Sequence, residues 1–149
     1  MIPPCPSPPR SSGTSYWAAC RLPHHCVGDQ VGRHLRFSPG GFTDLEFIAA
    51  WGQLRHGERD PALRTTHPPA ALQRMADRGE LAAVVLDDYR FLQRAGLRLR
   101  LIRDQHDDRL QAQDRSPLAR SLGMSEGQLD YELSKRMARV RVEFLRRLG

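Results

Sequence analysis

The chain has 149 residues, of which 40% are hydrophobic and 27% are charged, and its formal net charge is +6 at pH 7. This length supports one domain with a single core, and the composition is ordinary for a globular protein. No apolar run approaches the roughly 20 residues that span a bilayer, and no apolar segment of signal-peptide type begins the chain, so we expect a cytoplasmic protein without a membrane segment.

The first part of the chain, residues 1–30, is rich in proline and serine, and six of the 11 prolines fall within its first 23 residues. It shows neither helical nor strand periodicity, which predicts a disordered or irregular tail. Cys20, His24, His25 and Cys26 resemble metal ligands at first sight. Their spacing matches no common zinc pattern and no second ligand pair follows, so we predict no metal site.

Residues 31–149 are predicted to form one helical domain. A weak alternation over 31–37 favours one short strand, which the Ser-Pro-Gly-Gly sequence at 38–41 ends. Thr43 is an N-cap candidate and Glu46 follows three residues later, which is the pattern of a capping box. The helix that begins there should end near Gly57. Its expected apolar face contains Leu45, Ile48, Ala49 and Gly52, widened by Phe47, Trp51 and Leu54.

Four further segments have helical periodicity: 65–79, 80–106, 116–122 and 125–148. A Pro-Pro pair opens the first of them, Ser116 is the candidate N-cap of the third, and Ser125 is the candidate N-cap of the last. Short connections between these segments predict an all-α fold, an antiparallel bundle of four to five helices. The expected buried stripe of the last helix is Leu129, Leu133, Met137, Val140, Phe144 and Leu148.

Charged residues within these helices lead to two expectations. Asp88 falls on the apolar stripe of its helix, where it should pair with Arg90 or Arg94 or lie at the edge of the stripe. The basic residues of the last helix should lie mainly in solvent. They are Lys135, Arg136, Arg139, Arg141, Arg146 and Arg147.

Asp44 and Glu46 are the best candidates for chemistry. Two carboxylates two residues apart, directly after Gly40 and Gly41, could add a ligand to a Mg²⁺ site, and glycines would let phosphates approach the backbone closely. A structural role remains open for all four residues. Glu46 would complete the capping box, Asp44 would favour the positive end of the helix dipole, and the glycines would form the turn.

Two other clusters have a chemical and a structural interpretation. Arg55 and His56 lie at a predicted helix C-terminus, where cations are favoured by the dipole and could also bind phosphate. His106, Asp107 and Asp108 resemble a metal cluster, but a solvated loop explains them better.

An ordered series of short motifs resembles the glutamine-synthetase adenylyltransferase family. Phe37 to Ile48 resembles that family's Gly-Gly-x-x-Asp-Ile-Glu-Phe signature, with Leu45 at the position of the isoleucine. The order and spacing hold over about 110 residues, which makes the series more specific than any one piece. The further matching pieces are Trp51-Gly52-Gln53-Leu54-Arg55-His56-Gly57, Pro61-Ala62-Leu63-Arg64-Thr65-Thr66, Asp88-Tyr89-Arg90-Phe91-Leu92-Gln93-Arg94, Leu97-Arg98-Leu99-Arg100-Leu101 and the segment from Leu118 to Gly123.

This resemblance implies a role in nitrogen regulation. In that family a nucleotidyltransferase domain transfers AMP from ATP to a tyrosine of glutamine synthetase, and a related domain removes it by phosphorolysis. A helical domain follows each catalytic domain and is similar to one in uridylyltransferases that modify the regulatory protein PII. The family's ATP and Mg²⁺ are held through a Gly-Ser turn and an Asp-x-Asp pair, and neither pattern occurs in this sequence. Residues 1–30 also match nothing in the family.

The sequence therefore favours a helical docking or regulatory domain, a fragment or stand-alone piece of such an adenylyltransferase with a truncated or foreign front. We expect it to be inactive and without a cofactor of its own. Its partner would be glutamine synthetase or a separate catalytic nucleotidyltransferase chain. The first alternative is a basic interaction module whose last helix binds an acidic protein or nucleic acid, although nucleic acid is disfavoured because charge is its only support. The second is a remnant of a truncated gene without a role of its own.

Overall fold

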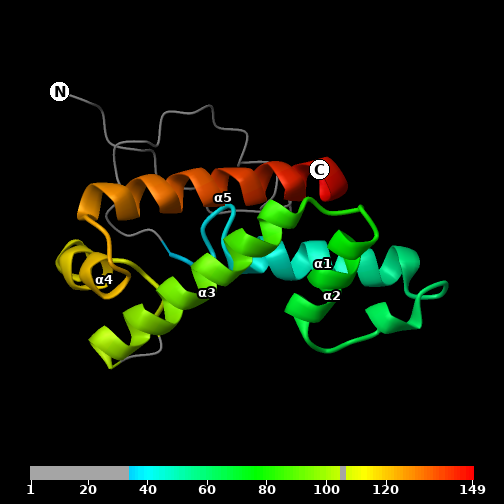
Figure 1. Cartoon of the computed structure of the whole chain (residues 1–149), viewed down its shortest axis with the longest axis horizontal. Coiled ribbons are helices and arrows are strands. Elements are labelled where there is room, and N and C mark those ends of the chain that lie inside the picture. Colours follow the sequence, from blue (N-terminus) through cyan, green and yellow to red (C-terminus); the bar gives the residue numbers. More distant parts are fainter. Residues whose placement is uncertain (1–33, 105–106) are drawn as a thin grey trace, which may run out of the picture.

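The computed structural model describes residues 34–104 and 107–149, and within these ranges it is all-α, as predicted (Figure 1). The described residues form five α-helices and two short 3₁₀-helices. In chain order these are α1 (Phe42–His56), η2 (Pro61–Leu63), α2 (Pro68–Asp77), α3 (Ala83–Arg103), η3 (Ala112–Asp114), α4 (Arg115–Ser121) and α5 (Glu126–Leu148). The tail predicted over 1–30, including its cysteines, lies outside the described residues, and so does His106.

The short strand predicted over 31–37 does not form in the part of it that the structure describes. His34 makes a single antiparallel bridge to Arg109, and the chain turns from Leu35 onward. The backbone N–H of Leu35 donates to the Asp108 carbonyl at 2.9 Å. A bridge of one residue thus fixes the entry to α1 where a strand was expected.

The three long helices do not all alternate in direction. Phe47 of α1 faces Phe144 of α5 with ring centroids 6.2 Å apart, and one turn further along both helices Trp51 lies against Arg147. Because the residue numbers of the contacting pairs increase together along both helices, α1 and α5 run in the same direction. α3 runs against both of them, with α4 and α2 at opposite ends of the molecule (Figure 1).

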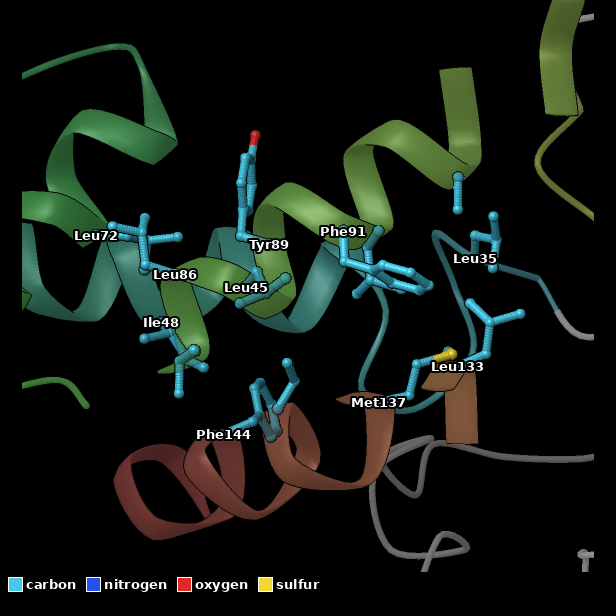
Figure 2. Close-up of a cluster of buried hydrophobic side chains, with 14 of the residues drawn as sticks. Leu35, Leu45, Ile48, Leu72, Leu86, Tyr89, Phe91, Leu133, Met137 and Phe144 are labelled. Atoms are coloured by element: carbon cyan, nitrogen blue, oxygen red, sulfur yellow. The ribbon is translucent and has the colours of Figure 1, made fainter. Parts of the chain in front are cut away.

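The core lies where α1, α2, α3 and α5 meet (Figure 2). Each fully buried leucine or isoleucine side chain contributes about 1.5–3 kcal/mol through removal of apolar surface from water. The stripe predicted for the last helix is confirmed apart from Leu148, which is 42% exposed. Buried residues from the four helices include Leu45, Ile48, Leu72, Met75, Phe91, Leu92, Leu133, Met137, Val140 and Phe144.

Several helix ends form as their sequences predict. The Ser125 hydroxyl accepts from the Gln128 backbone N–H at 3.2 Å, and the Gln128 side chain accepts from the Ser125 N–H at 2.9 Å, which makes a complete capping box. Prolines occupy the first turn of α2. Gly79 and Gly123, with φ of 73° and 72°, follow α2 and α4 in the left-handed conformation that glycine tolerates.

Two predicted caps are wrong. α1 begins at Phe42 with Gly41 as its N-cap, and no side-chain hydrogen bond caps it, so Thr43 and Glu46 form no capping box. α4 begins at Arg115, because a 3₁₀ turn precedes it and makes Ser116 part of the helix. In both places a neighbouring turn, which local sequence does not reveal, decides where the helix starts.

Asp88 is fully buried on α3 and binds two arginines of α5. Its carboxylate accepts from Arg139 Nε at 2.7 Å and Nη2 at 2.6 Å, and from Arg136 Nη1 at 3.1 Å. The predicted pairing with Arg90 or Arg94 is therefore wrong, and Arg90 instead pairs with Asp87 at 3.3 Å. Since a buried carboxylate needs charged partners, this cluster ties α3 to α5.

The last helix also differs from the expectation that its basic residues lie mainly in solvent. Besides Arg136 and Arg139, Arg141 binds Asp44 of α1, and Arg147 donates to Glu143 and to the backbone carbonyl of Glu80. Four arginines of α5 thus hold the bundle together. Lys135 and Arg146 remain exposed, as predicted.

Candidate functional site

The Gly-Gly turn before α1 lies against the backbone of α5. Gly40 has a φ of 80°, and a Cβ atom on it would come 1.8 Å from the carbonyl oxygen of Met137. A Cβ on Gly41 would come 2.4 Å from the carbonyl oxygen of Leu35. The space that the sequence analysis assigned to an approaching phosphate is therefore filled by protein backbone at both glycines.

Asp44 lies in the first turn of α1 and is 7% exposed. Its Oδ2 accepts from the Gly40 backbone N–H at 2.7 Å and from Arg141 Nη1 at 3.1 Å. The Arg141 guanidinium also stacks over the Phe144 ring at 4.7 Å. Asp44 thus joins the turn, α1 and α5, and this arrangement does not fit a Mg²⁺ ligand, because a cation would have to displace an arginine from a nearly closed site.

Glu46 makes a separate contact, away from Asp44. Its carboxylate accepts from Arg36 Nη2 at 3.1 and 3.3 Å, and both side chains are 41% exposed. An exposed pair of this kind contributes less than about 1 kcal/mol. Asp44 and Glu46 therefore bind arginines from different parts of the chain and do not converge on one ligand.

Glu46 does border a small cavity between α1 and α3, with a volume of about 170 Å³. Burial, and then the charge of Glu46, raise the pKa of Tyr89 in its wall. Arg100 is held there by Asp108 through two 2.7 Å hydrogen bonds. The other lining residues are Arg36, Phe42, Gln93, Gly96 and Leu97. Sequence reasoning missed this cavity because its walls lie some 50 residues apart in the chain.

The remaining candidate clusters also have structural partners. His56 Nε2 lies 3.0 Å from Glu80 Oε2, and Arg55 stacks over Trp51 at 5.4 Å. Asp107 accepts from the Arg109 backbone N–H and from the Arg103 side chain, and the first bond, followed by the second, lowers the pKa of its carboxyl group. Over residues 34–104 and 107–149, no group of three or more histidine, cysteine or acidic side chains is placed to hold a metal ion.

Asp60 is a buried carboxylate that sequence reasoning did not single out. It is 5% exposed and binds Arg74 at 2.8 Å and Arg78 at 3.2 Å, which joins η2 to the end of α2. The hydrogen bond from Arg74, followed by that from Arg78, holds the pKa of Asp60 below its ordinary value.

An apolar groove lies between the C-terminal parts of α1 and α5. It has a volume of about 360 Å³ and is lined by Phe47, Ala50, Trp51, Leu54, Arg55 and Leu148. Leu54, predicted to widen the buried face of its helix, is instead 89% exposed. The part of the chain that the structure describes contains no helix apolar and long enough to cross a membrane.

Comparison with known proteins places these features in a family context. The sequence model of the family described as GlnD PII-uridylyltransferase matches residues 24–147. Three curated relatives are each a bifunctional glutamine synthetase adenylyltransferase/adenylyl-removing enzyme. The one from Xanthomonas campestris pv. campestris is 34% identical over 128 residues, covering 81% of this chain and 13% of the relative. That from Stenotrophomonas maltophilia is 33% identical over 112 residues, covering 70% and 12%. That from Streptomyces avermitilis is 38% identical over 78 residues, covering 50% and 8%.

Proposed function

This chain belongs to the family of helical domains shared by glutamine-synthetase adenylyltransferases and PII-uridylyltransferases, and from that premise we propose that it is a docking domain for AMP transfer to glutamine synthetase. It would bind a nucleotidyltransferase core that holds ATP and Mg²⁺ and contributes the catalytic carboxylates. The chain spans about 13% of the length of its first curated relatives, so the AMP transfer itself would be carried out by that core.

The observation that carries this proposal is that the Asp44 carboxylate already has partners within the chain. Of the two carboxylates in the family signature, Asp44 is the more buried and would be the expected metal ligand. Its Oδ2 instead accepts hydrogen bonds from Arg141 and from the Gly40 N–H. The sequence also lacks the Gly-Ser turn and the Asp-x-Asp pair with which the family holds nucleotide. These contacts support a structural role for the signature residues of this chain, with the nucleotidyl-transfer chemistry supplied by the nucleotidyltransferase core.

Exposed apolar side chains support a catalytic core as the direct partner. Phe47, Leu54 and Leu148 are 42%, 89% and 42% exposed around the groove between α1 and α5. Apolar surface gathered in this way is typical of interfaces that remain closed, whereas short-lived substrate contacts are smaller and more polar. We therefore assign glutamine synthetase as the substrate of the assembled complex and the nucleotidyltransferase core as the bound partner.

The test is transfer of radiolabelled AMP from ATP to glutamine synthetase in the presence of Mg²⁺. Three samples are compared: this chain alone, the Xanthomonas campestris relative without its aligned region, and the two together. We expect no labelling by the chain alone and an increase when it is added to the shortened relative. If the shortened relative does not fold, a chimera that carries this chain in place of the aligned region is assayed instead.

Two outcomes contradict the proposal. Labelling of glutamine synthetase by the pure chain would show a complete catalytic site within it. An unchanged rate on addition of the chain, together with an inactive but folded chimera, would show that this domain does not serve the transfer reaction.

A further inference from the structure

We propose that the groove between α1 and α5 receives one amphipathic helix with acidic flanks, contributed by the nucleotidyltransferase core. This inference rests on the proposed function and specifies the surface and the chemistry of the contact. The groove lies where the C-terminal parts of α1 and α5 run side by side in the same direction (Figure 1). A seam between two parallel helices is a surface into which a third helix can pack its apolar side chains.

The surface next to the groove continues along α5 with the spacing of a helix–helix seam. Exposed Tyr131, Ala138, Val142 and Leu145 follow one another at steps of seven, four and three residues. Tyr131, Val142 and Leu145 are 62%, 64% and 49% exposed. Apolar residues at such steps form the contact line of a coiled coil. α5 therefore has a second apolar stripe, separate from the one that faces the core, and its spacing fits a helix better than a strand or a loop.

Charge at the borders of this surface indicates the flanks of the partner. Arg55 lines the groove, and Lys135 lies 5.3 Å from the Tyr131 ring on the stripe. Arg146 is 72% exposed but pairs with Glu143 at 3.2 Å, so Arg55 and Lys135 carry the positive border. Glu132, three residues before Lys135 on α5, is already paired with Arg136. A basic border favours an acidic helix, and it disfavours a second copy of this chain, which would bring like charges together.

Trp51 gives this surface a spectroscopic reporter. Its indole ring lines the groove and lies 5.4 and 5.5 Å from the guanidinium groups of Arg55 and Arg147. A helix that enters the groove must change the surroundings of this ring. Trp17 is the other tryptophan of the chain, so the W17F variant leaves Trp51 as the single emitter.

The experiment titrates designed peptides into the W17F chain and follows tryptophan emission. The first peptide is a helix of about 20 residues, about 30 Å long, with leucines at heptad a and d positions and glutamates beside them. The second is identical but carries lysines in place of the glutamates. We expect the acidic peptide to shift the emission and bind with a Kd below about 100 µM, and the basic peptide to bind at least about tenfold more weakly.

A matched pair of variants locates the binding site. Leu54→Asp changes a leucine of the groove, and Leu101→Asp changes a leucine that is 78% exposed on α3, outside the groove. Because both side chains are largely exposed, both variants should fold, which circular dichroism checks. We expect Leu54→Asp to lower the affinity of the acidic peptide at least about tenfold and Leu101→Asp to leave that affinity unchanged.

Three results would overturn the inference: equal affinity of the two peptides, equal effects of the two variants, or a dimer of this chain that Leu54→Asp dissociates. The same variants separate this inference from the proposed function. If the shortened relative binds the chain and Leu54→Asp does not weaken the complex, the groove is wrong and the docking function stands. If the acidic peptide binds in the groove but the shortened relative does not bind, the docking function fails.

Discussion

The substitution Gly40→Ala tests whether the Gly-Gly turn is a packing element. At a φ of 80°, an alanine costs about 1–2 kcal/mol in backbone strain alone. Its Cβ would also lie 1.8 Å from the Met137 carbonyl oxygen, where atoms of this kind do not approach within 3.0 Å. Since both sides of this contact are backbone, rotation of a side chain cannot relieve it, and α5 or the turn must move by roughly 1 Å or more.

Such a movement should weaken the hydrogen bond from Gly40 N–H to Asp44, which is worth about 1.5–3 kcal/mol because its acceptor is charged. Overpacking against α5 adds about 1–3 kcal/mol. The lower entropy of the unfolded alanine chain offsets about 0.4–1 kcal/mol. The net loss is about 3–7 kcal/mol if the hydrogen bond is lost, a large share of the roughly 5–15 kcal/mol that stabilises a domain.

Urea unfolding followed by far-UV circular dichroism measures this loss, and Gly123→Ala is the control. Gly123 has a φ of 72°, and a Cβ there meets nothing within 4 Å, so its variant carries the backbone strain without the clash. We expect Gly40→Ala to lose at least about 2 kcal/mol more than the control. A difference under about 1 kcal/mol would refute the close approach of α5 to the turn.

Three further predictions concern polar contacts within the fold. Asp88→Asn should lower the unfolding free energy by about 3 kcal/mol, because Arg139 loses its counter-charge and Arg136 keeps only Glu132. Asp87→Asn, at an exposed position, should change it by less than about 0.5 kcal/mol, and urea midpoints compare the two variants. The pKa of Asp60 is lowered in the folded state, so its stabilising effect is complete above about pH 4 and disappears as the pH falls through that pKa. The difference in unfolding free energy between wild type and Asp60→Asn should therefore be constant from about pH 7 to 5 and shrink in acid. A difference that does not depend on pH would contradict this. Ser125→Ala should lower the unfolding free energy by about 1 kcal/mol, and Thr43→Ala should leave it almost unchanged, as measured by thermal unfolding. The reverse order would show that Thr43 caps α1 after all.

Local sequence was sufficient for most of the helices. The Ser125 cap, the proline pair that opens α2 and the glycines after α2 and α4 act through neighbours within four residues, so the sequence shows them directly. The start of α1 could not be predicted in this way. Asp44 binds Arg141, 97 residues away, and this contact with the turn before α1 replaces the capping box that Thr43 and Glu46 suggested.

The candidate site shows the same limit. The residues Asp44, Glu46, Gly40 and Gly41 were found from the motif, but their partners come from α5 and from the segment before α1. Periodicity also left open whether a residue such as Leu54 faces the core or solvent, because a wide apolar face on one helix does not show how many neighbours cover it. The groove between α1 and α5 became visible only in the folded chain.

The most direct test of the docking function is sedimentation velocity of this chain mixed with the shortened Xanthomonas campestris relative. We expect a complex of one copy of each protein at micromolar concentrations, weakened by Leu54→Asp and unaffected by Leu101→Asp. Two separate species at all concentrations up to about 100 µM, with both proteins folded, would contradict the assignment of this chain as a docking domain.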